Sequence, residues 1–567
     1  MSSTSAIPSS TPQSSLSEPA QSIHRDLPEL SRSEIAKRIC EGQQLIIFHS
    51  EVLNVTAWSK YHPGGALALL HFVGRDASDE IEAYHCNETL DKMKRYIIGK
   101  VELDEKGWLP LTPPIALGLI HLTGQKSKNS WIKEGSVTLG TTILSNLPIS
   151  LNQSHDPIPT NPTTILTNTE SEKTPETISE NQRIYTLSTE QLEPPISEIN
   201  REIEYNRSKS FQELKKRITE AGLFKPTSGF LYGYETEILR YLLLASGAWG
   251  LFFYTNGWLG QMTSALCLGL LFQQLAFVVH DAGHKGITTN VFYDRLIGMT
   301  VASYIGGLSV GWWCDNHNIH HLVTNHPEHD PDIQHIPFFA ISKDFFSSLW
   351  STYYKRVMAL DGFSKIMIPL QHKLYYIVLS LARFNLYANS YIYLLGPKPK
   401  RDNYWRYELV GIAFYWFYYL SMLKSLPSWQ MRLGYLLVSH IAASPVHVQI
   451  VLSHFACSTE DLGPTESFPS RQLRTTMDVI CSENIEFIHG GLHLQVTHHL
   501  FPRLPRHNLR SASLLVKQYC EEQDIIYKEY GWLDGNKQVL SVLRDVANQL
   551  ELLKKVADGE IQERMMK

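Results

Sequence analysis

The five residues His280-Asp281-Ala282-Gly283-His284 come directly after an apolar run that starts near residue 259. Two histidines four residues apart lie on the same face of a helix, so their imidazoles can bind one metal ion together. The apolar run has the length of about 20 residues that is needed to cross the hydrocarbon core of a membrane. This stretch therefore predicts a membrane helix that ends at a metal centre.

Three further groups of histidines lie beside or after apolar segments. One lies in the loop after that span, one is a single histidine at the end of a later apolar run, and one lies near the C-terminal end. Iron binds imidazole well, and two iron ions need about eight or nine protein ligands if positions stay open for water or substrate. Zinc fits less well, because it usually takes four ligands that include cysteine, and none of the seven cysteines is suitably spaced. The predicted di-iron ligands are His280, His284, His317, His320, His321, His454, Gln495, His498 and His499.

Metal-bound imidazoles need acceptors for their second ring nitrogen. Proximity in the sequence is the only guide to these acceptors. The candidates are Asp281, Asp315, Asp330, Asp332 and Asn484.

Apolar segments of spanning length form two hairpins in the second half of the chain. Two weaker segments, 295–313 and 375–395, are expected to be re-entrant or interfacial, since the second carries Arg383 and Asn385, which are costly at the centre of a bilayer. The short turn at 255–258 is uncharged, whereas the loops that flank the hairpins are rich in Lys and Arg, which predicts cytosolic termini and a cytosolic active site. The four expected spans are 238–255, 259–279, 408–424 and 433–454.

A second candidate site lies near the N-terminus. The run Tyr61-His62-Pro63-Gly64-Gly65 is followed by the stretch GRDASDEIEAYH, which ends at His85. A haem iron with two axial imidazoles needs histidines on opposite sides of a slot, and proline followed by glycines lets the chain turn sharply. These residues resemble the cytochrome b5 family over about 75 residues, and the resemblance implies that His62 and His85 are the ligands of heme b.

Composition divides the chain into five parts. The expected parts are a disordered, Ser/Thr/Pro-rich tail, a folded domain, a Pro/Thr/Asn/Glu-rich linker that cannot bury enough apolar surface to fold, a membrane domain and a helical tail. The net charge of −5 argues against a nucleic-acid partner. No CxxC spacing or apolar leader is present, which predicts reduced thiols and no signal peptide. The predicted boundaries are 1–26, 27–103, 104–205, 206–530 and 531–567.

The histidine groups and the stretch GGLHLQVTHHLFPRLPRHNL resemble the membrane fatty-acyl desaturases across about residues 225–525. Gln495 stands where the third group usually begins with histidine, as in the front-end branch, and HDAGH with NHNIHHLVTNHPEHDPDIQHIPFF is similar to fungal Δ8-sphingolipid desaturases. The resemblance implies a multi-domain protein. Its parts would be a small α+β haem domain and an all-α integral-membrane domain with four transmembrane helices and a cytosolic di-iron cap.

The same resemblance implies the reaction and its partners. The expected reaction uses O2 and two non-haem iron ions to desaturate a sphingolipid long-chain base at C8–C9, in the membrane of the endoplasmic reticulum. Its electrons are expected to come from NADH through a cytochrome b5 reductase. A small residue at Gly283 suggests room beside the metal for a ceramide head group.

Three alternatives remain open from the sequence. The first is a Δ5 or Δ6 front-end acyl desaturase, and the second is a b5-fused lipid hydroxylase. The third is a membrane-tethered electron donor without an active site of its own, which would leave the clustered histidines unexplained.

Overall fold

The computed structural model describes residues 27–121, 131–133, 185–227, 229 and 231–566, with the side chains beyond residue 559 left aside. The predicted disordered tail, residues 1–26, lies outside the described residues, as does 134–184 in the middle of the predicted linker.

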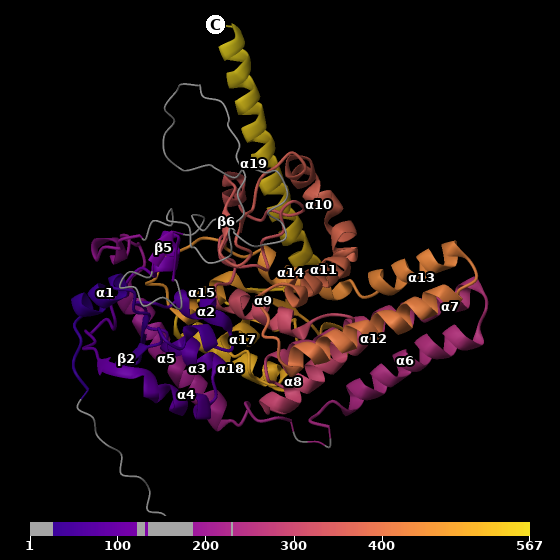
Figure 1. Ribbon diagram of the computed structural model, residues 1–567, viewed down its shortest axis with the longest axis horizontal. Helices are drawn as coiled ribbons and strands as arrows, with labels where there is room; N and C mark the ends of the chain where they lie inside the picture. The colour runs from indigo at the N-terminus through magenta and orange to yellow at the C-terminus, as the bar shows by residue number, and fades with distance from the viewer. Residues whose placement is uncertain (1–26, 122–130, 134–184, 228, 230, 567) are drawn as a thin grey trace, which may run out of the picture.

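The N-terminal domain is a small antiparallel sheet faced by short helices (Figure 1). Strand β2 (Glu51–Asn54) is central and pairs with β1 (Leu45–Phe48) and β3 (Ile97–Lys100). Leu45, Ile46 and Ile47 of β1 are buried, so this strand is covered on both faces. The helices are α1 (Arg32–Cys40), α2 (Gly65–Leu70), α3 (Ser78–Tyr84) and α4 (Asn87–Met93).

The described part of the predicted linker packs against this domain, and the boundary at residue 103 stays a prediction. Strands β4 (Leu119–His121) and β5 (Trp131–Lys133) pair with each other, and Trp108, Trp131 and Leu192 join the core formed by α1 and β1. The composition of 104–205 is polar on average, but its first part is not, and Leu111, Ile115 and Leu119 are buried in the same core. At its other end the segment runs into helix α5 (Arg201–Glu220), which begins before residue 205.

We expect Trp131→Ala to destabilise the N-terminal domain. Trp131 is fully buried, and its indole Nε1 donates a hydrogen bond to the Ile39 carbonyl over 2.6 Å. Loss of a buried tryptophan costs about 3–5 kcal/mol. The amide hydrogens of β1 and β2 should therefore exchange faster with solvent in this variant, because less free energy is needed to open the domain. The control is Leu117→Ala, at a more exposed position of the same segment, where exchange should be unchanged. Equal protection in both variants would show that 104–121 and 131–133 are not part of the domain.

The second part of the chain is a helical domain. Figure 1 shows four helices lying side by side as an elongated bundle that extends away from the N-terminal domain: α6 (Glu235–Tyr254), α7 (Trp258–Gly283), α12 (Asn403–Ser425) and α13 (Trp429–Ile441). Its remaining helices pack beside this bundle, and the last of them projects away from the rest of the molecule in Figure 1. They are α8 (Val291–Met299), α9 (Val310–Leu322), α10 (Ser364–Ser380), α11 (Ala382–Leu395), α14 (Pro445–Phe455), α15 (Phe468–Thr475), α16 (Glu486–His489), α17 (Gln495–Leu500), α18 (Leu509–Glu522) and α19 (Trp532–Met566).

Two short strand pairs lie among these helices. Strands β6 (Trp350–Ser351) and β7 (Arg356–Val357) pair antiparallel. Strands β8 (Asp478–Ile480) and β9 (Glu529–Gly531) pair parallel and join the segment before α16 to the start of α19. The predicted C-terminal tail is therefore anchored: Val539, Leu543 and Val546 of α19 are buried in a core that α10 shares.

Two segments are long and apolar enough to cross a membrane among the residues that the structure describes. They are α7 (Trp258–Gly283) and the segment Trp429–Phe455 that α13 (Trp429–Ile441) and α14 form. The prediction of four spans is therefore not confirmed by length and composition. The other two expected spans fall on α6 (Glu235–Tyr254), which starts with charged residues, and α12 (Asn403–Ser425), which is rich in tyrosine and tryptophan.

The weaker apolar segment near residue 300 is sharply bent. Helix α8 continues through one π-helical turn (Thr300–Ile305), and α9 then leaves at an angle of 117°. The Ser309 hydroxyl accepts a hydrogen bond from the Trp312 backbone N–H and caps the start of α9. If the two bent helices are counted together as one broken span, they make a third candidate span. The bend directs the histidines of α9 back toward the end of α7.

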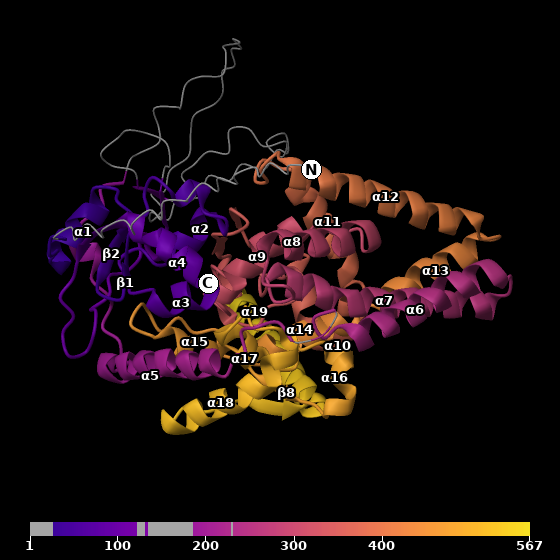
Figure 2. The same ribbon diagram turned by 90° about the horizontal axis from the view of Figure 1, so that it is seen from below.

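The two domains are in direct contact. Apolar residues of the sheet and of α2 and α3 share a core with Ile319 and Leu322 of α9. Figure 2 shows α5 running along the N-terminal domain next to α15 and α18. The N-terminal domain is thus packed against the part of the helical domain that carries the histidines.

Candidate active site

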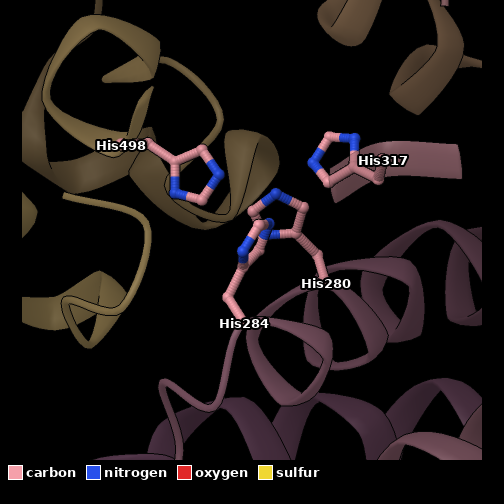
Figure 3. A group of neighbouring side chains, drawn as sticks. All are labelled: His280, His284, His317 and His498. Carbon is pink, nitrogen blue, oxygen red and sulfur yellow. The ribbon is translucent and has the colours of Figure 1, made fainter. Parts of the chain in front are cut away.

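Four histidines from three helices form a first group. Figure 3 shows His280 and His284 from α7 turned toward His317 of α9 and His498 of α17. One nitrogen from each ring lies within 4.8 Å of one nitrogen from each of the others. This is the arrangement that imidazole ligands of one metal ion require.

Three buried histidines form a second group. His320 of α9, His454 of α14 and His499 of α17 bring their ligand nitrogens within the same distance of one another. His454 therefore joins residues that are far from it in the sequence. A further grouping, His317 with His320 and Asp332, links the two groups through α9.

His321 lies between the groups. Its Nε2 atom is 3.0 Å from Nε2 of His317 in the first group. Its ring stacks on that of His499 in the second group, with centroids 4.1 Å apart. The sequence placed the histidines 317–321 in a loop, which is wrong: they lie in α9, so the i, i+3 and i+4 spacing turns them toward one region.

The free ring nitrogens fit a metal centre. Within the described part of the chain, five of these rings have a buried nitrogen without a hydrogen-bond partner: Nε2 of His280, His284, His498 and His499, and Nδ1 of His321. A buried polar atom left unpaired costs free energy, and a bound cation would use these lone pairs. Burial also lowers the pKa of His498 and His499 well below the usual value, so both are neutral and able to bind a metal.

Two predicted carboxylates orient histidines of α9. His320 donates from Nδ1 to both oxygens of Asp330 at 2.9 and 3.0 Å, and His317 pairs with Asp332 at 3.4 Å. Burial opposes ionisation of Asp332, but His320 and His317 hold its pKa well below the usual range. Each pairing leaves Nε2 of the ring for the metal, as in other histidine metal sites.

The other predicted carboxylates and amides differ in position. Asp281 lies near His280, at 3.6 Å from Nδ1, and pairs with Arg506 at 2.9 Å. Asp315 instead bonds to Tyr353, and Asn484 is exposed, so neither orients these histidines.

Sequence reasoning missed one orienting residue. The Gln472 side chain accepts from His499 Nδ1 at 3.0 Å and donates to the His321 carbonyl at 2.8 Å. No local signal in α15 marks this glutamine, because its role depends on packing between distant helices.

Gln495 is buried in the first turn of α17, three and four residues before His498 and His499. That spacing puts its amide on the same side of the helix as both rings. Its role as a ligand stays a prediction.

Gly283 has a different role from the one expected. A Cβ atom at this position would lie 2.1 Å from the Trp313 ring, which also stacks on His317 with centroids 4.4 Å apart. The space beside this glycine is thus filled by Trp313 and offers no room for a lipid head group.

We expect Asp330→Asn to weaken metal binding. Asp330 is fully buried, fixes the ring of His320 and accepts hydrogen bonds from the backbone N–H groups of Asn325 and Asp332. Loss of such an outer partner typically costs about 10–100-fold in metal affinity or activity, measured as iron retained after dialysis against a chelator. The exposed Asp534→Asn should retain as much iron as the unchanged protein, and equal retention by Asp330→Asn would refute the role.

The N-terminal domain holds His62 and His85 on opposite sides of a slot. Their ring centroids are 6.2 Å apart, a distance that suits two imidazoles bound to the same iron from opposite sides, each with its nitrogen about 2 Å from the metal. Nδ1 of His62 bonds to the Gly65 carbonyl at 3.0 Å, and Nδ1 of His85 bonds to the Ile81 carbonyl at 2.8 Å. Both Nε2 atoms are thereby left for iron, and burial lowers the pKa of His62 to about 4, so this ring is neutral.

Two known families match the two domains. Residues 256–531 match the family described as Fatty acid desaturase, and residues 31–102 match the Cytochrome b5-like Heme/Steroid binding domain.

Individual relatives cover almost the whole chain. A protein of Kluyveromyces lactis named Delta 8-(E)-sphingolipid desaturase is 42% identical over 92% of this chain and 93% of its own length. A protein of Emericella nidulans with the same name is 41% identical over 92% of this chain and 95% of its own length. A Borago officinalis protein named Delta(8)-fatty-acid desaturase is more distant, at 32% identity over 60% of this chain and 76% of its own length.

Proposed function

The chain belongs to the membrane desaturases with a fused cytochrome b5-like domain, within the branch of the fungal Delta 8-(E)-sphingolipid desaturases, and we propose that it introduces a C8–C9 double bond into the long-chain base of ceramide or a related sphingolipid. The E geometry in the relatives' name is part of this proposal. The similarity extends over both domains, which favours the sphingolipid substrate over a front-end acyl chain.

One observation carries the proposal. Histidines from α7, α9, α14 and α17 meet in two adjacent groups with unpaired ring nitrogens, and the b5-like domain packs against the same helices. A lipid hydroxylase would share such groups, but the relatives carry the desaturase name. A b5 that only donates electrons would need neither histidine group.

The chain's own residues hold and orient the cofactors in this proposal. Two non-haem iron ions, when bound, supply the O2-dependent removal of two hydrogens from an alkyl chain, which side chains cannot perform by acid–base chemistry. The reaction consumes O2, two electrons and two protons and yields the alkene and two waters. The ligands proposed are His280, His284, His317, His320, His321, His454, His498 and His499, with Gln495 as a further candidate.

Electrons enter through the N-terminal domain. His62 and His85 are the proposed axial ligands of heme b, and an NADH-dependent cytochrome b5 reductase is the proposed donor. Apolar side chains exposed on α6 and α12, among them Leu243, Phe253 and Phe417, support membrane contact on these helices as well. We propose the four spans on this ground, with the histidines and both termini on the cytosolic side of the endoplasmic reticulum.

The experiment that tests the function is expression in a yeast without Δ8 activity, followed by hydrolysis of its sphingolipids. A new C8–C9 double bond in the long-chain bases is expected. Unsaturation confined to fatty acids would indicate a Δ5 or Δ6 acyl desaturase. A hydroxyl group in place of the double bond would indicate a hydroxylase.

A further inference from the structure

Tyr84 connects the two candidate metal sites. It directly precedes His85 in the sequence. Its ring meets the His321 ring edge to face, with centroids 6.3 Å apart and planes at 83°. Tyr84 is thus bonded through the backbone to a residue of the haem slot and touches, through its ring, the histidine that lies between the two metal groups.

The surroundings of Tyr84 are apolar and belong to both domains. Tyr84 packs against one apolar cluster that includes Ile81 and Ile319 and against another that includes residues of α5 and α17. Its hydroxyl is buried and has no hydrogen-bond partner among the described residues. Burial accordingly raises its pKa well above the usual value, so the side chain stays neutral. The hydroxyl therefore makes no polar contact with the described residues, and the ring alone forms the contact with His321.

Polar contacts hold the helix that ends at Tyr84 against the helical domain. Glu80 pairs with Arg471 at 3.0 Å, and Glu82 pairs with Lys215 at 2.7 Å. Asp79 accepts a hydrogen bond from the Ser208 hydroxyl at 2.6 Å. Helix α3 is therefore fixed on two sides, through α5 and α15, and the contact between Tyr84 and His321 is part of a defined interface.

We propose that Tyr84 is the relay through which electrons pass from the haem to the metal centre. The inference rests on the proposed function, in which each transfer oxidises the haem iron by one electron and reduces the non-haem metal by one. Two transfers supply the two electrons of each desaturation. Tyr84 is joined to His85 by a peptide bond, its ring makes the contact with His321, and the ring is itself neither oxidised nor deprotonated.

The other haem-side tyrosine provides a matched control. Tyr61 directly precedes His62 as Tyr84 precedes His85, but its side chain is 66% exposed. A variant at Tyr61 removes an aromatic ring at the same distance in sequence from the other histidine. It leaves the contact with His321 intact.

The experiment uses the full-length protein loaded with haem and iron in detergent. The haem is reduced chemically, the protein is mixed with O2 and ceramide, and the decay of the reduced-haem absorbance is followed. We expect Tyr84→Leu to slow this decay by about tenfold or more, equivalent to about 1.4 kcal/mol of added barrier. Tyr84→Phe, which keeps the ring, and Tyr61→Leu should decay at the rate of the unchanged protein.

Further measurements separate relay from structure. The haem spectrum and midpoint potential should be the same in all variants, and a zero-length cross-link between Glu82 and Lys215 should form with equal yield, showing that the domains remain docked. If Tyr84→Leu is poorly folded, Tyr84→Met fills a similar apolar volume and should be equally slow. Decay as fast in a folded Leu or Met variant as in the unchanged protein would overturn the relay, as would a Phe variant as slow as Leu.

Metal-free protein distinguishes this failure from failure of the proposed function. If the unchanged protein loses its reduced-haem absorbance equally fast with and without iron at the histidine groups, electrons do not pass to that site. That result would refute the proposed desaturase function. Iron-dependent decay that is indifferent to Tyr84 refutes only the relay.

Discussion

Replacing His454 by alanine is expected to abolish desaturation and to lower iron content without removing the protein from the membrane. His454 is buried beside His320 and His499, and its Nδ1 atom lies 3.4 Å from the Thr475 carbonyl, which leaves Nε2 for the metal. Loss of an outer partner already costs about 10–100-fold, so loss of a ligand should reduce turnover by at least about 100-fold. Product formation and iron per protein are both measured.

A neighbouring histidine serves as the control for that experiment. His447 is buried in the same helix, α14, but belongs to none of the ligand groups found among the described residues. His447→Ala should therefore retain its iron. A His454→Ala protein that kept full iron content and full turnover would exclude the ligand role and leave His454 as a packing residue.

The histidine groups show which part of the site can be predicted from sequence. Pairs such as His280 and His284 can be recognised in the sequence, because helical spacing alone places both rings on one face. His454 could be singled out only because it ends an apolar run. The division into two groups, with His321 between them, depends on how α9 crosses α7 and α17, and the local sequence carries no signal for that crossing.

The errors have a common physical cause. The segment 104–205 is polar on average, yet Trp108, Leu111, Ile115, Leu119 and Trp131 are buried in the core of the N-terminal domain. Average composition misses such anchors because a few large apolar side chains bury a large area while barely changing the mean over about a hundred residues. Gly283 was interpreted by local shape, whereas its neighbour Trp313 comes from another helix, α9.

Packing between the domains was also beyond the sequence. The acidic residues of α3 are typical of an exposed helix, and their pattern gives no partner. In the structure, hydrogen bonds from His49 and Lys215 overcome the effect of burial and hold the pKa of Glu82 at about 2. The partner Lys215 lies on α5, beyond the Pro/Thr-rich segment, so only the folded chain brings the two together.

Replacing His85 by alanine is expected to remove both the b5-type spectrum and the desaturation. His85 lies across the slot from His62, and its Nδ1 bond to the Ile81 carbonyl fixes the ring with Nε2 free. Without this imidazole the haem iron loses one axial ligand, which changes its spectrum and its reduction potential. The haem-to-protein ratio and the reduced absorbance spectrum report the first effect, and sphingolipid analysis reports the second.

Free cytochrome b5 should not restore the activity of His85→Ala. The N-terminal domain occupies the face of the helical domain next to His321, held by the ion pairs of Glu80 and Glu82. A haem-free domain that remains docked there excludes a soluble donor from the same surface. His49→Ala, in the same domain but outside the slot, should keep the spectrum. A His85→Ala protein with a normal reduced spectrum would refute the ligand assignment, and rescue by soluble b5 would show that the docked domain is readily displaced.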